Sequence, residues 1–190
     1  CIRDRMLTEP SFDEQILARN KARLLVGLQQ QKQDPGSLAS IAFSKALYGD
    51  HPYAHPSVGT LETVPNIKRQ QLIDFKNRYL VAANASLAMT GNLTLAQAKN
   101  LAEEITADLP IGQAAAILPE PKPLTQSQHI HIPFPSSQTT VLMGQLGDKR
   151  ATDPQAQQKQ TNFAVGNEVL AGGDFNARLM TEVRQNLGYT

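Results

Sequence analysis

Apolar residues recur at intervals of three and four along most of this chain, which is the spacing that places side chains on one face of a helix. In residues 128–134, by contrast, apolar and polar residues exchange at every position, which is the pattern of a strand. The helical pattern predicts six helices, at residues 11–33, 34–49, 68–79, 94–109, 153–170 and 174–187.

Boundary residues support these helices. Two segments, Ser11–Glu14 and Thr94–Gln97, have the form of a capping box, in which a hydroxyl and an acid or amide three residues later satisfy the first backbone N–H groups. Asp34–Pro35 and Asp153–Pro154 are further start signals, since proline suits the first turn. Gly188 is well placed for a left-handed helix cap.

Three segments, 86–90, 128–134 and 138–146, read as strands. Segregated strands and helices predict an α+β fold, an antiparallel sheet with helices packed on one face. Pro119, Pro121 and Pro123 mark a composition break. We therefore expect the end of one domain at 1–110, a semi-extended linker at 111–127 and the beginning of a second domain at 128–190.

Composition narrows the possible functions. The 190 residues are 41% hydrophobic and 18% charged with a net charge of +1, so no global charge calls for nucleic acid. No apolar run reaches the roughly 18 residues of a membrane span. Cys1 is the one cysteine, which excludes an internal disulfide or a thiolate metal cluster. A start at Cys rather than Met leads us to expect a piece of a longer protein, with a lipid-modified Cys as the alternative.

Two pairs of histidines have spacings known from metal sites. His51 and His55 are four apart, but Pro52 and Pro56 prevent a shared helical face, so locally hydrogen-bonded loop histidines are the favoured interpretation. His129 and His131 lie on one face of a predicted strand, with no Cys, Asp or Glu nearby. A solvated strand face is favoured there.

Catalytic motifs are absent from the sequence. Gly172–Gly173 lacks the residues of a phosphate-binding loop, and neither a Gly-x-Ser-x-Gly elbow nor a basic-aromatic patch occurs. Arg184 near the glycine break could offer its planar guanidinium to a carbonyl or a carboxylate. The residues alone favour a surface arginine that pairs with Glu182 or complements the helix dipole.

Several segments together resemble the insulinase/pitrilysin family of zinc metallopeptidases over nearly the whole chain. The matching segments are Pro10–Glu14, Leu47–Tyr53 with Gly59, Tyr79, Asn84–Gly91, Gln138 with Gly144, and Leu170–Leu179 leading into Val183–Arg184. The resemblance implies repeated α+β domains, paired into halves that enclose a chamber. It also implies a zinc motif, His-x-x-Glu-His, upstream of residue 1.

The third zinc ligand of catalytic family members, a Glu on the long first helix, aligns with Gly27. Glycine cannot bind zinc, and neither Val26 nor Leu28 can replace it. The resemblance therefore implies that this chain holds no metal and has no catalytic residue of its own. Zinc is expected in a partner subunit or in an upstream half.

The resulting interpretation is a non-catalytic partner that completes the peptide-binding chamber of a homologous, zinc-bearing subunit. By resemblance, Arg184 contacts the peptide substrate. The companion Tyr is expected one position beyond Thr190, and Tyr189 has the wrong spacing. The alternatives are a catalytic zinc endopeptidase and a structural scaffold. The resemblance also implies a periplasmic location, with no nucleic acid and no membrane span.

Overall fold

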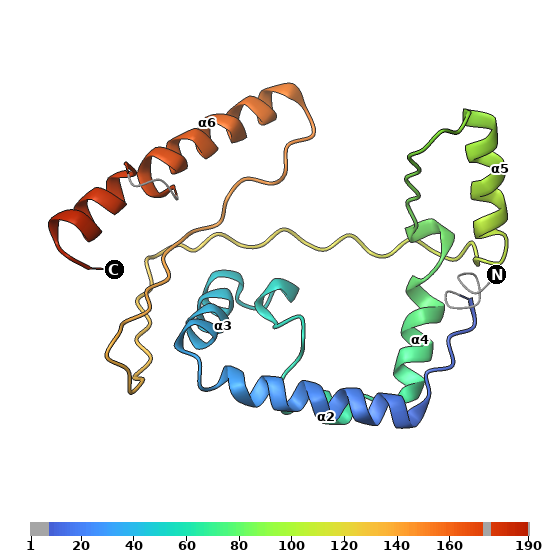
Figure 1. Ribbon diagram of the computed structural model, residues 1–190, viewed down its shortest axis with the longest axis horizontal. Coiled ribbons are helices and arrows are strands. Elements are labelled where there is room, and N and C mark those ends of the chain that lie inside the picture. The colour runs from blue at the N-terminus through green and yellow to red at the C-terminus, as the bar shows by residue number, and fades with distance from the viewer. Residues whose placement is uncertain (1–7, 173–175, 190) are drawn as a thin grey trace. The chain divides into compact units, whose positions relative to one another are not determined.

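The computed structural model describes residues 8–172 and 176–189. Helices and short turns account for all regular structure in these ranges (Figure 1). The α-helices are α2 (Glu14–Gln31), α3 (Pro35–Tyr48), α4 (Arg69–Tyr79), α5 (Leu95–Thr106) and α6 (Pro154–Ala171). Short 3-10 turns are η1 (Pro52–Ala54), η2 (Val64–Asn66) and η3 (Ala82–Asn84), and η4 (Met180–Asn186) is a π-helix.

The predicted α+β fold is wrong for the described residues, which contain no strand and no antiparallel sheet. Segments 86–90, 128–134 and 138–146 run as open chain, and no ladder of backbone hydrogen bonds joins them. A strand needs a neighbouring strand that pairs with its N–H and C=O groups. The alternation of apolar and polar residues predicts which side chains share a face, but it does not show that a neighbouring strand is present.

Five of the predicted helices are present with nearly the expected bounds, and the boundary residues of α3, α5 and α6 act as expected. The capping box at Thr94 is formed, with Gln97 returning its side-chain oxygen to the Thr94 N–H at 2.9 Å. Asp153 accepts a hydrogen bond from the Ala156 N–H at 2.9 Å and begins α6. Gly49 ends α3 with a φ of 56°, a conformation that glycine adopts without steric cost.

The start of α2 differs from the predicted capping box. Asp13, rather than Ser11, caps the helix by accepting from the backbone N–H groups of Gln15 and Ile16. Phe12 has a positive φ of 43°. Arg69 of α4 reaches across and donates to the carbonyl oxygens of Phe12 and Ser11, each at 2.9 Å. These two hydrogen bonds connect the beginning of α2 with the beginning of α4, although the bonded residues are more than fifty positions apart in sequence.

The molecule consists of two compact units, Cys1–Met143 and Gly144–Thr190. The first unit has a small core of apolar side chains, and α3 packs on η1 while α2 packs on η2. The buried apolar residues of this core are Leu28, Leu47, Ala54, Val64 and Val81. Lys21 of α2 fixes the η2 turn by donating to the carbonyls of Pro65 and Ile67 at 2.6 and 2.9 Å.

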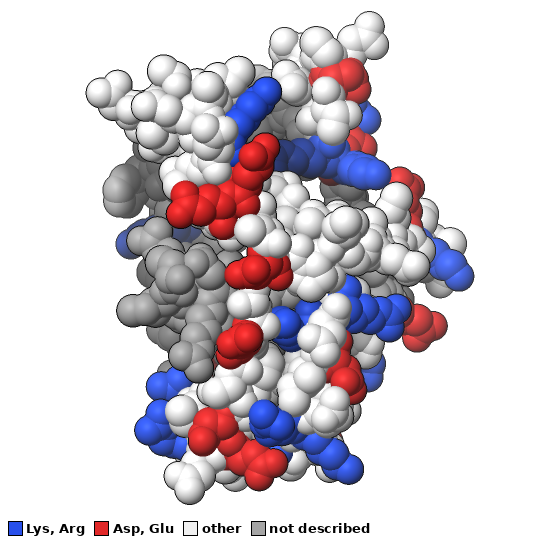
Figure 2. Space-filling view, turned by 90° about the vertical axis from the view of Figure 1, so that its right-hand side faces the viewer, with Lys and Arg blue, Asp and Glu red and all other residues white. Residues whose placement is uncertain are grey.

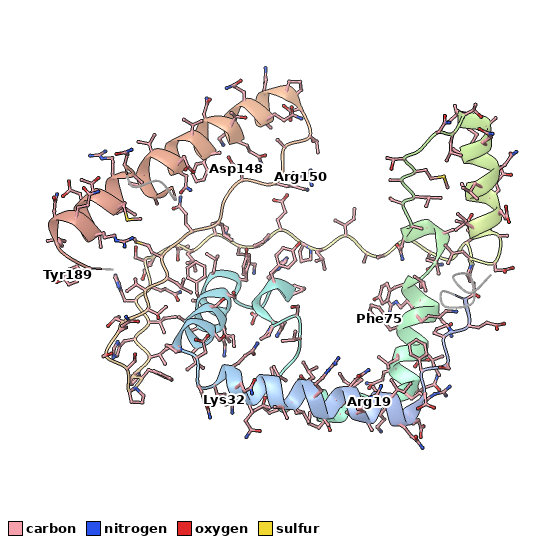
Figure 3. All side chains as sticks on the ribbon, in the orientation of Figure 1. Arg19, Lys32, Phe75, Asp148, Arg150 and Tyr189 are labelled. Atoms are coloured by element: carbon pink, nitrogen blue, oxygen red, sulfur yellow. The ribbon has the colours of Figure 1, made fainter. Side chains whose placement is uncertain are left out.

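The second unit is organised by α6. Asp148 and Arg150 lie in the segment that precedes this helix (Figure 3). Asp148 forms an ion pair with Lys159 at 2.8 Å. The Gln160 side chain donates to the Lys149 carbonyl and accepts from the Ala151 N–H, so its amide pairs with the main chain of this segment as a neighbouring strand would. These contacts hold the segment against the first turns of α6. The domain boundaries expected at residues 110 and 128 stay a prediction.

A pH test of the α3 start follows from Asp34. Hydrogen bonds from the Ser37 side chain and then its backbone N–H lower the pKa of Asp34 below its ordinary value of 3.8. Because the folded pKa is depressed, this cap stabilises the fold above that value and loses its effect as the pH falls through the folded pKa. We expect the Asp34→Asn variant to be less stable at neutral pH, with the difference from wild type shrinking in acid. Urea unfolding at several pH values measures this, and a pH-independent difference would contradict it.

Candidate functional site

Arg184 lies in η4, a π-helix rather than the α-helix that the periodicity predicts. The Leu187 N–H donates to the Glu182 carbonyl at 3.2 Å, and the Tyr189 N–H donates to the Val183 carbonyl at 3.0 Å. Single π turns within helices are rare and are frequent at functional sites. Arg184 is exposed on this helix.

The helix end follows the prediction. Gly188 has a φ of 72°, which confirms the left-handed cap. Tyr189 is exposed at the end of the described chain (Figure 3). Of the apolar stripe expected on this helix, Phe175 lies outside the described residues, as do Gly173 and Asp174, so the glycine corner is not described here.

Gly27, the position that the resemblance assigns to the third zinc ligand, lies in the interior of α2 and is half-buried. A Cβ built at Gly27 would meet no other atom within 4 Å, so packing does not require a glycine here. Val26 and Leu28 supply no metal donor. Among the described residues, no group of three or more His, Cys, Asp or Glu is arranged to hold a metal ion. These residues do not fit a zinc ion, and we derive no zinc-dependent step through them.

Replacing Gly27 by alanine is expected to stabilise the protein by about 0.5–1 kcal/mol, because alanine loses less backbone entropy in a helix and the site has room for a methyl group. Gly166 of α6, which also has open space, is the matched control. Thermal and urea unfolding measure both variants. A destabilised Gly27→Ala variant beside a stabilised Gly166→Ala variant would contradict the expectation.

His51 makes the local hydrogen bond that the interpretation from sequence expects, and it makes a second, long-range one that this interpretation did not include. The residue is 8% exposed, and its ring lies 4.7 Å from the Tyr53 ring, centroid to centroid. Nδ1 accepts from the Tyr53 N–H at 3.1 Å, so Nε2 carries the proton and donates to the Pro119 carbonyl at 2.8 Å. Both ring nitrogens are thus engaged in hydrogen bonds. His55 is exposed, and His129 and His131 are exposed on open chain.

An open hollow of about 660 Å³ lies beside His55. Its lining combines one polar face of α3 with the loop that follows. The lining includes Ser37, Ser40, Ser44, Tyr53 and Val58. Among the described residues, no hydrogen bond joins His55 to these serines, so the hollow contains no paired nucleophile and base.

Two residues with structural consequences carried little signal in the sequence. Asn84 uses its side chain to connect the Tyr79 carbonyl with the Ala115 N–H. Gly112 has a φ of 61°, and a Cβ there would overlap with the side chain of buried Val81. A glycine two residues after Pro110 was the available hint.

Charge on the surface is mixed. Figure 2 shows Lys and Arg interspersed with Asp and Glu on one face of the molecule, without a broad area of a single sign. A nucleic-acid interface would present a continuous basic stripe, and this face does not. None of the described helices is both long enough and apolar enough to cross a membrane.

Residues 66–190 match the family described as the peptidase M16 inactive domain. Among solved structures, the chain is similar to a peptidase M16 inactive domain from Pseudomonas fluorescens. The two are 38% identical with a TM-score of 0.82, and the match covers 96% of this chain and 43% of the other.

Curated relatives are more distant. An uncharacterized zinc protease of Rickettsia bellii is 23% identical over 94% of this chain and 41% of its own length. An uncharacterized zinc protease of Bacillus subtilis is also 23% identical, over 96% of this chain and 42% of its length. The chain thus spans less than half the length of these relatives.

Proposed function

We propose a role for this chain, which belongs to the peptidase M16 inactive-domain family. It is the non-catalytic part of a zinc peptidase and completes the peptide-binding chamber of a zinc-bearing partner. The insulinase/pitrilysin resemblance inferred from the sequence is thereby confirmed at the level of the family. The partner role, the peptide substrate and the chamber are our proposal.

The observation that carries this proposal is the match of residues 66–190 to a domain described as inactive. Gly27 supports it from the other end of the chain. A residue without a side chain occupies the position that the resemblance assigns to a zinc ligand, and its surroundings leave space where a longer side chain would fit. The zinc protease names of the relatives indicate that metal-dependent proteolysis belongs to the family.

Exposed apolar side chains support a further polypeptide as partner. Phe163 and Val169 of α6 are 67% and 59% exposed. A partner that covers such side chains removes their apolar area from water, which favours association.

In this proposal Arg184 supplies the chain's chemical contribution. A guanidinium presents paired N–H donors in a fixed plane, and a substrate carbonyl that gains negative charge during peptide hydrolysis accepts such donors more strongly in the transition state. Arg184 would thus bind and orient the scissile peptide, while the partner supplies the metal chemistry. Arg184 is exposed on η4, as a residue that contacts a substrate must be.

Zinc analysis and peptide hydrolysis by the purified full-length protein test the proposal, first alone and then after mixing with the zinc-bearing homologue from the same organism. We expect substoichiometric zinc and no cleavage for the protein alone, and cleavage for the mixture above that of the homologue alone. One zinc per chain together with cleavage by the protein alone would overturn the proposal.

A catalytic zinc endopeptidase is the second candidate, favoured by the zinc protease names of the relatives. Its zinc motif would lie in a part of the protein outside these 190 residues.

We further propose a periplasmic location, on the family resemblance alone, and fractionation of cells that express the full-length protein tests it. Recovery of the protein in the cytoplasmic fraction would refute that location.

A further inference from the structure

The segment from Pro110 to Pro119 belongs to the first unit and contains no helix or strand, yet it is docked on the rest of that unit at three points. At the first point, the Ala82 N–H donates to the Pro110 carbonyl at 2.7 Å and the Ala83 N–H donates to the Ile111 carbonyl at 3.0 Å. Gly112 follows at once, with its Cα against buried Val81. Figure 1 shows this segment as an extended trace that leaves the region of α5 and runs past α3.

The second and third docking points are made by side chains of the first unit. Asn84 accepts from the Ala115 N–H at 2.7 Å, while its amide nitrogen donates to the Tyr79 carbonyl at 3.0 Å. His51 donates from Nε2 to the Pro119 carbonyl at 2.8 Å. Its Nδ1 is held by the Tyr53 N–H, so the ring is oriented toward Pro119 before the segment arrives.

Main-chain groups of the segment, rather than its side chains, make these contacts. Every residue from 111 to 120 is exposed, and Ile117 is 95% exposed. A segment that buries no apolar side chain gains little hydrophobic stabilisation from docking. Its attachment therefore depends on a few hydrogen bonds, each of modest net strength.

We propose that Pro110–Pro119 is a docked strap and that His51 is its releasable latch. The first docking point is the strongest, because two backbone bonds and the fitted Gly112 act together. The latch is a single bond at the far end of the strap. Opening the latch while Asn84 still holds Ala115 releases Ala116–Pro119, and four residues of extended chain span about 14 Å. The latch thus determines whether the fixed part of the strap ends at Ala115 or continues to Pro119.

The test uses a variant that removes only the latch. In His51→Asn, the Asn oxygen takes the place of Nδ1 and can still accept from the Tyr53 N–H, but no donor reaches Pro119. His55→Asn is the matched control, because His55 is exposed in the same loop and provides none of the hydrogen bonds given above for the strap. Thermolysin, which cuts before large apolar residues, probes the strap at the exposed Ile117–Leu118 pair.

We expect His51→Asn to be cut at Ile117–Leu118 roughly five-fold faster than wild type, as loss of one hydrogen bond predicts for a local opening. His55→Asn should be cut at the wild-type rate. Hydrogen exchange at the Ala82 and Ala83 amides, which report the first docking point, should stay unchanged. Adding Asn84→Ala should accelerate the cut further.

Two results would overturn the latch. One is a cutting rate for His51→Asn within two-fold of wild type. The other is faster exchange at Ala82 and Ala83 in the same variant, because His51 would then support the fold of the whole unit rather than the strap alone. Neither result depends on zinc, on a partner or on peptidase activity, so the proposed function is tested separately.

Discussion

Replacing Arg184 by alanine is expected to lower turnover of the assembled peptidase by about 100-fold or more, while the variant still assembles with its partner. Loss of one donor to a developing oxyanion costs this much in well-studied hydrolases. The effect should appear mainly in kcat, because the interaction is stronger in the transition state than in the bound substrate. Steady-state hydrolysis of a peptide by the mixture of both subunits measures it.

Two companion variants make this prediction specific. Arg184→Lys keeps the positive charge but loses the planar fork, so it should recover only part of the lost turnover. Arg150→Ala removes an exposed arginine from the same unit without touching η4, and it should leave turnover unchanged (Figure 3). Full activity of Arg184→Ala would favour a structural scaffold over a substrate-binding role.

The Gly112→Ala variant is expected to destabilise the first unit by about 2–4 kcal/mol. An alanine at a φ of 61° is in the left-handed region, which costs about 1–2 kcal/mol, and its Cβ would overlap with Val81. Val81 is buried, so it cannot turn away without disturbing its neighbours. Hydrogen exchange of the Ala82 and Ala83 amides measures the loss at the site, since both donate to the adjoining strap.

Gly188→Ala separates the two causes. Gly188 has a similar φ of 72°, but a Cβ there would meet nothing within 4 Å. Its substitution should therefore cost only the backbone term, about 1–2 kcal/mol. Equal losses for both variants would show that overlap with Val81 contributes nothing and that the strap is not closely fitted at Gly112.

Much of the candidate site could be located from the sequence, though its form could not. Arg184 and Gly27 were selected by their places within recognisable segments, and Gly188 by its position after a periodic stretch. The π-helical turn around Arg184 was not predictable, because periodicity cannot distinguish a helix with one wide turn from a regular α-helix. Whether Arg184 contacts substrate and whether Gly27 replaces a ligand are still predictions.

Local chemistry determined the helices of this protein. Three helices begin where a side chain accepts hydrogen bonds from backbone N–H groups within one turn. The residues are Asp34 with Pro35, Thr94 with Gln97, and Asp153 with Pro154. Because such contacts join residues that are close in sequence, the sequence alone predicts them.

Tertiary structure alone decided which open segments find a partner. Residues 128–134 alternate like a strand but remain unpaired, whereas Pro110–Pro119, with no strand pattern, docks through Ala82, Asn84 and His51. The physical reason is that a backbone N–H or C=O group outside the helices forms hydrogen bonds with residues that are distant in sequence and that the fold places beside it. The sequence shows that such groups need partners, and only the folded chain shows which residues supply them.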